Sequence, residues 1–170
     1  NLIQAASMAS AFPIVGIDIN KSKETLAKAV GAHHFTDQDN QDLSLYLEQF
    51  AASKQVDVAI DTTGNPEVIA SLSSRLSNRG RLILVGQPKP GSALTLPNAV
   101  NLFGTQGKKI MSTQGGQTDP TVDIPKYVKL QENSMLEYSK VITHTFELAQ
   151  INDAFETLKS GTAGRIMVNI

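Results

Sequence analysis

Short apolar runs alternate with segments of helical periodicity along this 170-residue chain. Two of the runs, residues 56–61 and 82–86, are largely apolar at consecutive positions rather than at every second one. Consecutive apolar residues are typical of parallel strands covered on both faces. The alternation of such strands with helices therefore predicts an α/β domain, doubly wound around a mostly parallel sheet.

The same patterns give approximate element boundaries. Strands are predicted over residues 13–19, 34–36, 56–61, 82–86, 109–113, 141–146 and 165–170. Helices are predicted over residues 1–10, 21–30, 41–53, 65–76, 120–133 and 148–160, with short elements at 94–96 and 98–103. Asn20 and Asn65 can cap the helices that follow them, and Pro66 fits a first helical position, where its missing N–H costs nothing. Residues 78–80 are expected to end the helix that Asn65 opens.

Composition narrows the classes of function. Fifteen basic against sixteen acidic residues leave a net charge of −1, so we expect no general nucleic-acid binding. No apolar run approaches the roughly 20 residues of a membrane helix. The sequence contains no cysteine, which excludes disulfides, thiolate zinc ligands and cysteine nucleophiles within this chain. This composition is compatible with a cytoplasmic protein, which is the expected location.

Asp18 is the most informative single residue. It ends an apolar strand and precedes a helix, where dinucleotide-binding folds place an acid that accepts hydrogen bonds from the adenosine ribose. A carboxylate there also repels the extra phosphate of NADP and so favours NAD. An ordinary aspartate in a strand–helix turn is the alternative. The accompanying G-x-G-x-x-G loop would lie upstream of Asn1, and residues 1–10 are interpreted as a helix cut part-way.

An ordered set of motifs resembles the zinc-type medium-chain alcohol dehydrogenases. The motifs are residues 1–11, the stretch Ile17-Asp18-Ile19-Asn20 with Lys23, Asp61-Thr62-Thr63-Gly64, residues 80–86, Gly115-Gly116, residues 142–144, residues 151–155 and residues 160–165. The resemblance covers essentially the whole chain. It implies that residues 1–170 are the NAD-binding domain, of Rossmann type, without the family's GroES-like catalytic domain. It also implies that the first, central strand of the sheet order 3-2-1-4-5-6 is missing.

The resemblance also implies a set of residues that contact the cofactor. Asp18 and Lys23 match residues at the adenosine ribose; Thr62, Thr63 and Gly64 match the loop over adenine and ribose; Val85, Gly86 and Gln87 match the strand end at the nicotinamide carboxamide; Thr113, Gln114 and Gly115 match the next strand end; and Arg165 matches an arginine at the pyrophosphate. Each has a plainer alternative. Lys23 and Arg165 would then be surface cations, and the glycines would be turn residues.

The residues do not predict a metal site or a catalytic residue in this chain. His33 and His34 are adjacent, so in a strand they point to opposite faces and cannot bind one ion together. His144 is far from them in the sequence. Asp37, Asp39 and Asp42 lack the glycine and closing glutamate of a calcium loop. Zinc is therefore implied only for the parent enzyme, bound by the absent domain.

The resemblance implies an enzyme that passes a hydride between an alcohol and NAD, with this fragment inactive alone. Its substrate would be a small alcohol or aldehyde, and a homodimer would form through the edge strand within residues 98–113. Two alternatives are an S-adenosylmethionine-dependent methyltransferase, whose last strands form an antiparallel hairpin, and a non-enzymatic dimerisation module. A missing central strand would leave backbone groups unpaired, so we expect upstream residues or a partner to fill the gap.

Overall fold

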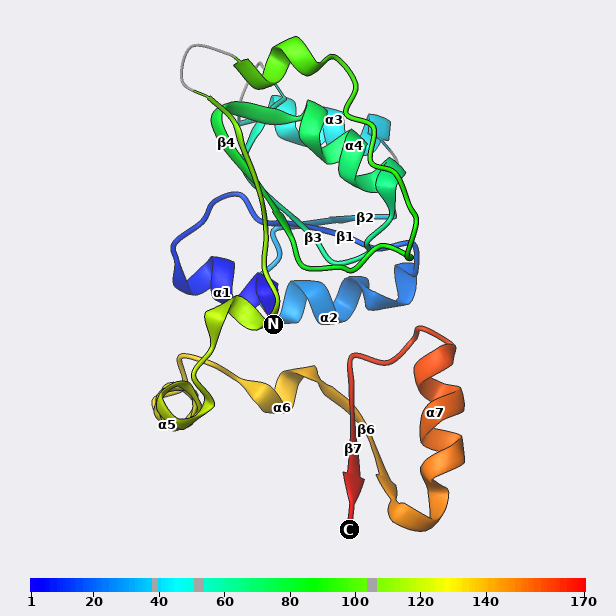
Figure 1. Ribbon diagram of the computed structural model, residues 1–170. Coiled ribbons are helices and arrows are strands. Elements are labelled where there is room, and N and C mark those ends of the chain that lie inside the picture. Colours follow the sequence, from blue (N-terminus) through cyan, green and yellow to red (C-terminus); the bar gives the residue numbers. More distant parts are fainter. Residues whose placement is uncertain (38–39, 51–53, 104–106) are drawn as a thin grey trace. The chain divides into compact units, whose positions relative to one another are not determined.

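The computed structural model describes residues 1–37, 40–50, 54–103 and 107–170, and it confirms the alternation of strands and helices (Figure 1). The helices are α1 (Leu2–Met8), α2 (Glu24–Ala29), α3 (Asn40–Glu48), α4 (Pro66–Ser74), α5 (Pro120–Glu132), α6 (Tyr138–Val141) and α7 (Ile151–Lys159). The strands are β1 (Val15–Ile17), β2 (His34–Thr36), β3 (Val56–Asp61), β4 (Leu76–Leu84), β5 (Lys109–Ser112), β6 (Ile142–Glu147) and β7 (Arg165–Asn169). Short 3-10 turns are η1 (Lys21–Lys23), η2 (Ala99–Phe103), η3 (Gly115–Gln117) and η4 (Leu148–Gln150).

The chain divides into two compact units. Unit 1 contains Asn1–Tyr46 and Pro120–Ile170, and unit 2 contains Leu47–Asp119. Unit 1 holds the pairs β1-β2 and β6-β7, unit 2 holds the sheet β3-β4-β5, and all of these pairings are parallel. The predicted sheet order 3-2-1-4-5-6 counts a first strand that this chain lacks. The pair β2-β1 corresponds to positions 3-2 of that order, and β3-β4-β5 corresponds to positions 4-5-6. Among the described strands, β1 pairs only with β2 and β3 only with β4.

Unit 2 is a three-stranded parallel sheet with α4 packed on one face. The register places Ala59 beside Leu82 and Leu82 beside Ile110, so the three side chains point to the same face. Ile69 of α4 joins their core, in which Leu82 is completely buried. Val58 lies in the alternate register and is 43% exposed. The apolar run in β3 therefore has one well-covered face, which fixes which residues of each strand form the core.

Unit 1 builds a small core around β1 and β2. Ala27 of α2 packs with Ala32 and Phe35, and Ile3 of α1 covers the same cluster. Gly16 of β1 lets Phe35 approach, since an added Cβ would lie 3.3 Å from its ring. Ala27 is the buried residue of α2, so the helix covers this core with the face that carries it. This packing fixes β1 in place and so positions the residues that follow the strand.

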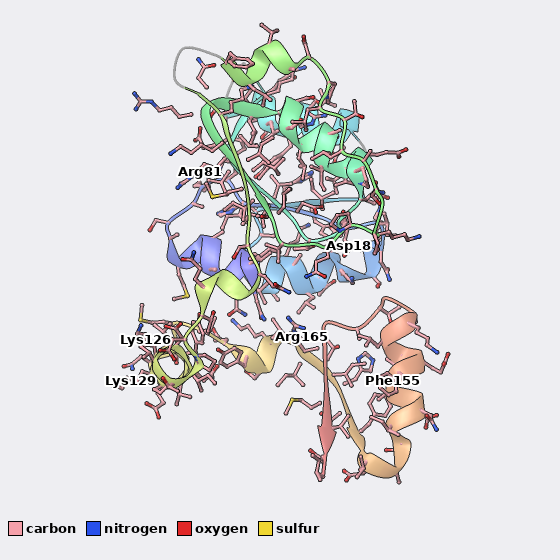
Figure 2. The ribbon with its side chains drawn as sticks, in the orientation of Figure 1. Asp18, Arg81, Lys126, Lys129, Phe155 and Arg165 are labelled. Carbon is pink, nitrogen blue, oxygen red and sulfur yellow. The ribbon has the colours of Figure 1, made fainter. Side chains whose placement is uncertain are left out.

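The last elements of unit 1 form a parallel β6-α7-β7 arrangement (Figure 1). Ala154 on α7 is buried, whereas Phe155, labelled in Figure 2, is 53% exposed. Phe146 of β6 is in register with Val168 of β7, and both are half-buried. A methyltransferase would show an antiparallel hairpin at this point, so the parallel pairing does not support that alternative.

Several predicted boundaries are wrong. Residues 78–80 do not end a helix and begin a turn, because β4 already starts at Leu76, which pairs with Val56. The register then resumes with Arg81 opposite Val58, so residues 77–80 bulge from the strand. Residues 94–96 form neither helix nor strand, and α6 has no counterpart in the prediction. Residues 51–53 of the third predicted helix lie outside the described residues.

The described helices include none whose length and apolar character would suit a membrane span.

The two predicted helix starts are confirmed. Asn65 Oδ1 accepts a hydrogen bond from the Glu67 backbone N–H at 2.9 Å, with Pro66 at the first helical position. Asn20 Oδ1 accepts one from the Ser22 N–H at 3.1 Å, although the helix begins with the 3-10 turn η1. Each cap satisfies a backbone N–H that has no partner within its helix, which stabilises the helix start at this position.

His34 links β2 to α3. Its Nε2 lies 2.8 Å from Asp42 Oδ2, and its ring stacks on Tyr46 with centroids 4.2 Å apart. The hydrogen bond with His34 is the main reason that the pKa of Asp42 is below its usual value. His33 has different neighbours: its Nδ1 accepts from the Ile14 N–H, and its ring meets Phe12 edge-on. The two adjacent histidines therefore have separate partners, and only His34 belongs to the strand β2.

This pair predicts a pH-dependent contribution to stability. A carboxyl whose pKa is lowered by folding stabilises the protein above its unfolded pKa, and that stabilisation is lost as pH falls through the folded pKa. We expect Asp42→Asn to lower the urea midpoint at pH 6 and to lower it less at about pH 2, because the Asp42 carboxyl, whose pKa lies below the usual value of about 4, is closer to its protonated form there. Asp37→Asn, which changes an exposed carboxylate nearby, is the matched control. An equal loss at both pH values would contradict this role.

Candidate functional site

The residues predicted to bind a cofactor fall into two groups, one in each unit. Asp18, Lys23 and Arg165 belong to unit 1, and the residues that follow β3, β4 and β5 belong to unit 2. Polar groups gather at the carboxyl ends of strands in both. Ligands of open parallel sheets bind at this edge, because the chain turns there and exposes backbone and side-chain polar groups.

Asp18 is the first residue after β1. Its Oδ1 accepts from the Asn20 N–H at 2.9 Å, and its Oδ2 accepts from Lys23 Nζ at the same distance. The side chains of Asp18 and Lys23 are 31% and 30% exposed. An ionised carboxylate offers about four acceptor positions, so these two bonds leave room for further donors. The structure thus pairs Asp18 with Lys23, a contact that the sequence did not predict, and leaves part of the carboxylate open.

Asn20 supports this turn and was not among the predicted site residues. Its Oδ1 accepts from Ser22, while its Nδ2 donates to the Gly161 carbonyl at 3.0 Å. Gly161 follows α7 and has φ +71°, a left-handed conformation that glycine adopts without strain. Asn20 therefore ties the turn after β1 to the loop that leads into β7. The sequence signal was its position as a helix cap, which does not reveal the second contact.

Arg165 is the first residue of β7 and is exposed (Figure 2). No hydrogen bond or ion pair found among the described residues joins Arg165 to Asp18 or Lys23. Its charge is available to an anion, but the structure does not bring these three residues into one bonded cluster.

Unit 2 contains a cavity of about 420 Å³ beside the ends of β4 and β5. Five of the predicted residues line it: Val85, Gly86, Gln87, Thr113 and Gln114. Apolar side chains of α4 and the loop after Gln87 complete its wall. Predominantly apolar walls with a few polar groups are typical of small-molecule sites. The two strand ends that the sequence placed together are therefore adjacent, around one cavity.

The loop after β3 packs directly against the loop after β4. Gly64 has φ +66°, and a Cβ there would lie 2.3 Å from the Gln87 carbonyl oxygen. At Gly86 a Cβ would lie 2.3 Å from the Gly64 nitrogen and 2.5 Å from the Thr62 carbonyl carbon. Real Cβ atoms do not approach backbone so closely. These glycines are therefore required by the contact between two backbones and are more than turn residues.

Asp61 is a site residue that the sequence reasoning missed. It is 1% exposed, and its carboxylate accepts hydrogen bonds from the loop containing Thr63 and Gly64. The available signal was an aspartate at a strand end followed by Thr-Thr-Gly, since aspartate often accepts from backbone N–H groups two residues later. The sequence could suggest this turn but not its burial.

Gly115 begins a turn after β5 and does not line the cavity. It has φ +71°, and its carbonyl oxygen accepts from the Thr118 N–H at 3.2 Å and from the Thr118 hydroxyl. Thr113 Oγ1 accepts from the Gly116 N–H at 2.9 Å. The turn closes on itself, so Gly115 shapes the end of β5 and Thr113 directs the chain around it.

Comparison with known proteins identifies the family. Residues 1–133 match the family model described as zinc-binding dehydrogenase. The chain belongs to this family. It is 30% identical to alcohol dehydrogenase 1 of Solanum tuberosum over 171 aligned positions, covering 98% of this chain and 44% of that protein. L-threonine 3-dehydrogenase of Bacillus subtilis is 25% identical, with 98% of this chain and 46% of that protein covered.

A solved structure supports the same relationship. The alcohol dehydrogenase zinc-binding domain protein from Burkholderia ambifaria superposes with a TM-score of 0.88 at 27% identity, over 99% of this chain and 44% of that one. The dehydrogenase chain thus spans less than half the length of these relatives. It shares their α/β fold, and the ordered motifs found in the sequence correspond to a real family relationship.

The described residues of this zinc-binding dehydrogenase chain do not fit zinc. The sequence has no cysteine, and no group of three or more His, Asp or Glu side chains within the described ranges could hold a metal ion. Zinc normally needs three or four such ligands. Asp39 lies outside the described residues.

The contact between the two loops gives a stability prediction. We expect Gly86→Ala to destabilise the dehydrogenase chain by about 1–3 kcal/mol or more, because its Cβ would meet backbone that cannot move aside as a side chain can. Urea denaturation would measure the loss. Gly91→Asn is the control: no atom lies within 4 Å of a Cβ there, and asparagine tolerates its positive φ. Equal stability of wild type and Gly86→Ala would contradict the tight contact.

Proposed function

We propose that this chain is the coenzyme-binding part of an NAD-dependent alcohol dehydrogenase. The observation that carries the proposal is the half-open Asp18 carboxylate at the end of β1, in a chain of the zinc-binding dehydrogenase family. Ribose hydroxyls are donors that such a carboxylate accepts, and its charge disfavours the extra phosphate of NADP. The substrate class is a small alcohol or the corresponding aldehyde, as the names of the plant relatives suggest.

Each group of residues has a separate role in this proposal. In unit 1, Asp18 and Lys23 hold the adenosine ribose, and the Arg165 charge neutralises the pyrophosphate. In unit 2, backbone groups of residues 85–87 and of Thr113 and Gln114 orient the nicotinamide carboxamide, and Gly115 shapes the turn that follows them. Residues 62–64 lie over the adenine and ribose side. The bound nicotinamide supplies the hydride acceptor. The chain's own residues bind and orient, and none of those described is assigned a proton transfer.

We also infer that residues 1–170 function within a longer enzyme whose GroES-like catalytic domain lies outside this chain. Relatives are more than twice as long as the matched region. The helix α5, with Lys126 and Lys129 labelled in Figure 2, has no buried residue. Its apolar residues Ile124, Tyr127 and Val128 follow one another at helical spacing and are about half exposed. Zinc, in this proposal, is held by the catalytic domain, and the fragment alone is inactive.

The cofactor proposal is tested by NADH fluorescence titration of the full gene product. Asp18→Asn removes the charge and keeps the size of the side chain. We expect it to weaken NADH binding about tenfold or more, since a hydrogen bond to a charged group contributes ~1.5–3 kcal/mol. The preference for NADH over NADPH should fall as well. Asp153→Asn, at an exposed position of α7, is the control. Unchanged affinity and preference in Asp18→Asn would overturn the assignment.

A homodimer through the edge of unit 2 is the second proposal. Among the described strands, β5 pairs only with β4, so one of its edges carries unpaired backbone groups. Phe103, just before it in the sequence, is 83% exposed, and Met111 on β5 is 41% exposed. An open strand edge with apolar neighbours favours pairing with a second copy across a two-fold axis. This interaction is compatible with the enzymatic role.

The dimer proposal is tested by light scattering after size-exclusion chromatography. We expect Phe103→Asp to convert a dimer into monomers, because a desolvated carboxylate would be placed in an apolar contact. Phe155→Asp introduces the same change at an exposed position of α7 and should leave the dimer intact. A monomeric wild type, or equal dissociation in both variants, would contradict an interface at this edge.

A further inference from the structure

Asp61 is a fully buried carboxylate that the proposed cofactor contacts do not use. It is the last residue of β3 and is 1% exposed. Aspartate is rarely buried unless its charge is matched by donors, because removing an ionised carboxylate from water costs a large free energy. The position of such a group beside a candidate binding site needs a physical reason.

The donors to Asp61 come from residues predicted to contact the cofactor. Oδ1 accepts from the Thr63 N–H at 3.1 Å and from Thr63 Oγ1 at 2.7 Å, while Oδ2 accepts from the Gly64 N–H at 2.9 Å. The Asp61 backbone carbonyl accepts from the N–H groups of Val85 and Gly86, at 2.8 and 3.0 Å. One residue thus fixes the loops after two neighbouring strands.

We propose that Asp61 is a positioning residue for the cofactor site, an inference that rests on the proposed function. It acts through the Thr62-Thr63-Gly64 loop. Its carboxylate holds two consecutive N–H groups and so fixes the left-handed turn at Gly64. That turn lets Gly64 lie against the Gln87 carbonyl, and Gln87 lines the cavity. The charge of Asp61 is thereby converted into a fixed backbone geometry at the cavity wall.

The carboxylate form of the side chain matters for this role. Both oxygens of Asp61 act as acceptors, and one of them accepts from the Gly64 N–H. An asparagine would offer only one acceptor oxygen and would direct an NH2 donor at a donor of the loop. A buried N–H left without an acceptor is costly, so the loop would move away. The effect would be local to residues 62–64, since the apolar core around Leu82 is separate from these bonds.

Asp57 provides a matched comparison within the same strand. It lies near the start of β3, is exposed, and accepts a hydrogen bond from Ser77 Oγ at 2.6 Å. Asp57→Asn removes a charge from the same strand by the same chemical change, at the opposite end from the cavity. A general effect of altered strand charge would appear in both variants, whereas loop positioning would appear only in Asp61→Asn.

The test measures NADH affinity and amide hydrogen exchange in the full gene product, well below the melting temperature of each variant. In Asp61→Asn we expect NADH to bind about tenfold or more weakly. Protection of the Thr63 and Gly64 amides should fall while that of the Leu82 amide is kept. Asp57→Asn should resemble wild type in both measurements. A merely structural role would lower the melting temperature without changing the affinity of the folded fraction.

A milder variant covers the case in which Asp61→Asn does not fold. Thr63→Val removes one donor to Asp61 and keeps the size of the side chain, so it should weaken NADH binding several-fold and lower the protection of the Gly64 amide. If wild type binds NADH and neither Asp61→Asn nor Thr63→Val differs from it, the positioning role is overturned and the proposed function stands. Equal weakening in Asp57→Asn also overturns it. If wild type does not bind NADH, the proposed function and this inference both fail.

Discussion

The contact between the backbones at Gly64 and Gly86 is the constraint on which the unit 2 site depends. Neither position has space for a Cβ, so the loops after β3 and β4 approach more closely than side chains would allow. Asp61 bonds both loops and holds them in this contact. The residues at the ends of β4 and β5 then line one cavity. The position of the candidate nicotinamide contacts follows from this backbone packing.

The two aspartates at strand ends illustrate how environment separates roles. Asp18 and Asp61 both follow apolar strand residues and both accept from backbone N–H groups two positions later. Asp18 keeps part of its carboxylate in solvent and is paired with Lys23, so it can still accept from a ligand. Asp61 is enclosed, and its oxygens are used by the protein. The same residue type thus keeps acceptor positions open to solvent in one unit and fixes loop geometry in the other.

Much of the fold was predictable because local signals and burial agree. Residues 56–61 form β3 as predicted, and the cap Asn65 with Pro66 begins α4 at the expected position. The prediction failed where local signals conflict with packing. Asn78, Arg79 and Gly80 are typical of a turn, yet Leu76 is completely buried against β3 and draws the chain into the strand before the bulge. Burial of an apolar side chain therefore outweighed turn propensity.

The sequence by itself determined the α/β alternation, the helix starts at Asn20 and Asn65, the family motifs and, through the lack of cysteine, the absence of thiolate ligands from this chain. These depend on local spacing and composition. Only the tertiary structure decided that Asp61 is buried, that Gly86 is required by a backbone contact, and that Val85 and Thr113 border one cavity. Each of these depends on residues far apart in the chain, whose proximity is created by strand pairing and is not encoded in any local pattern.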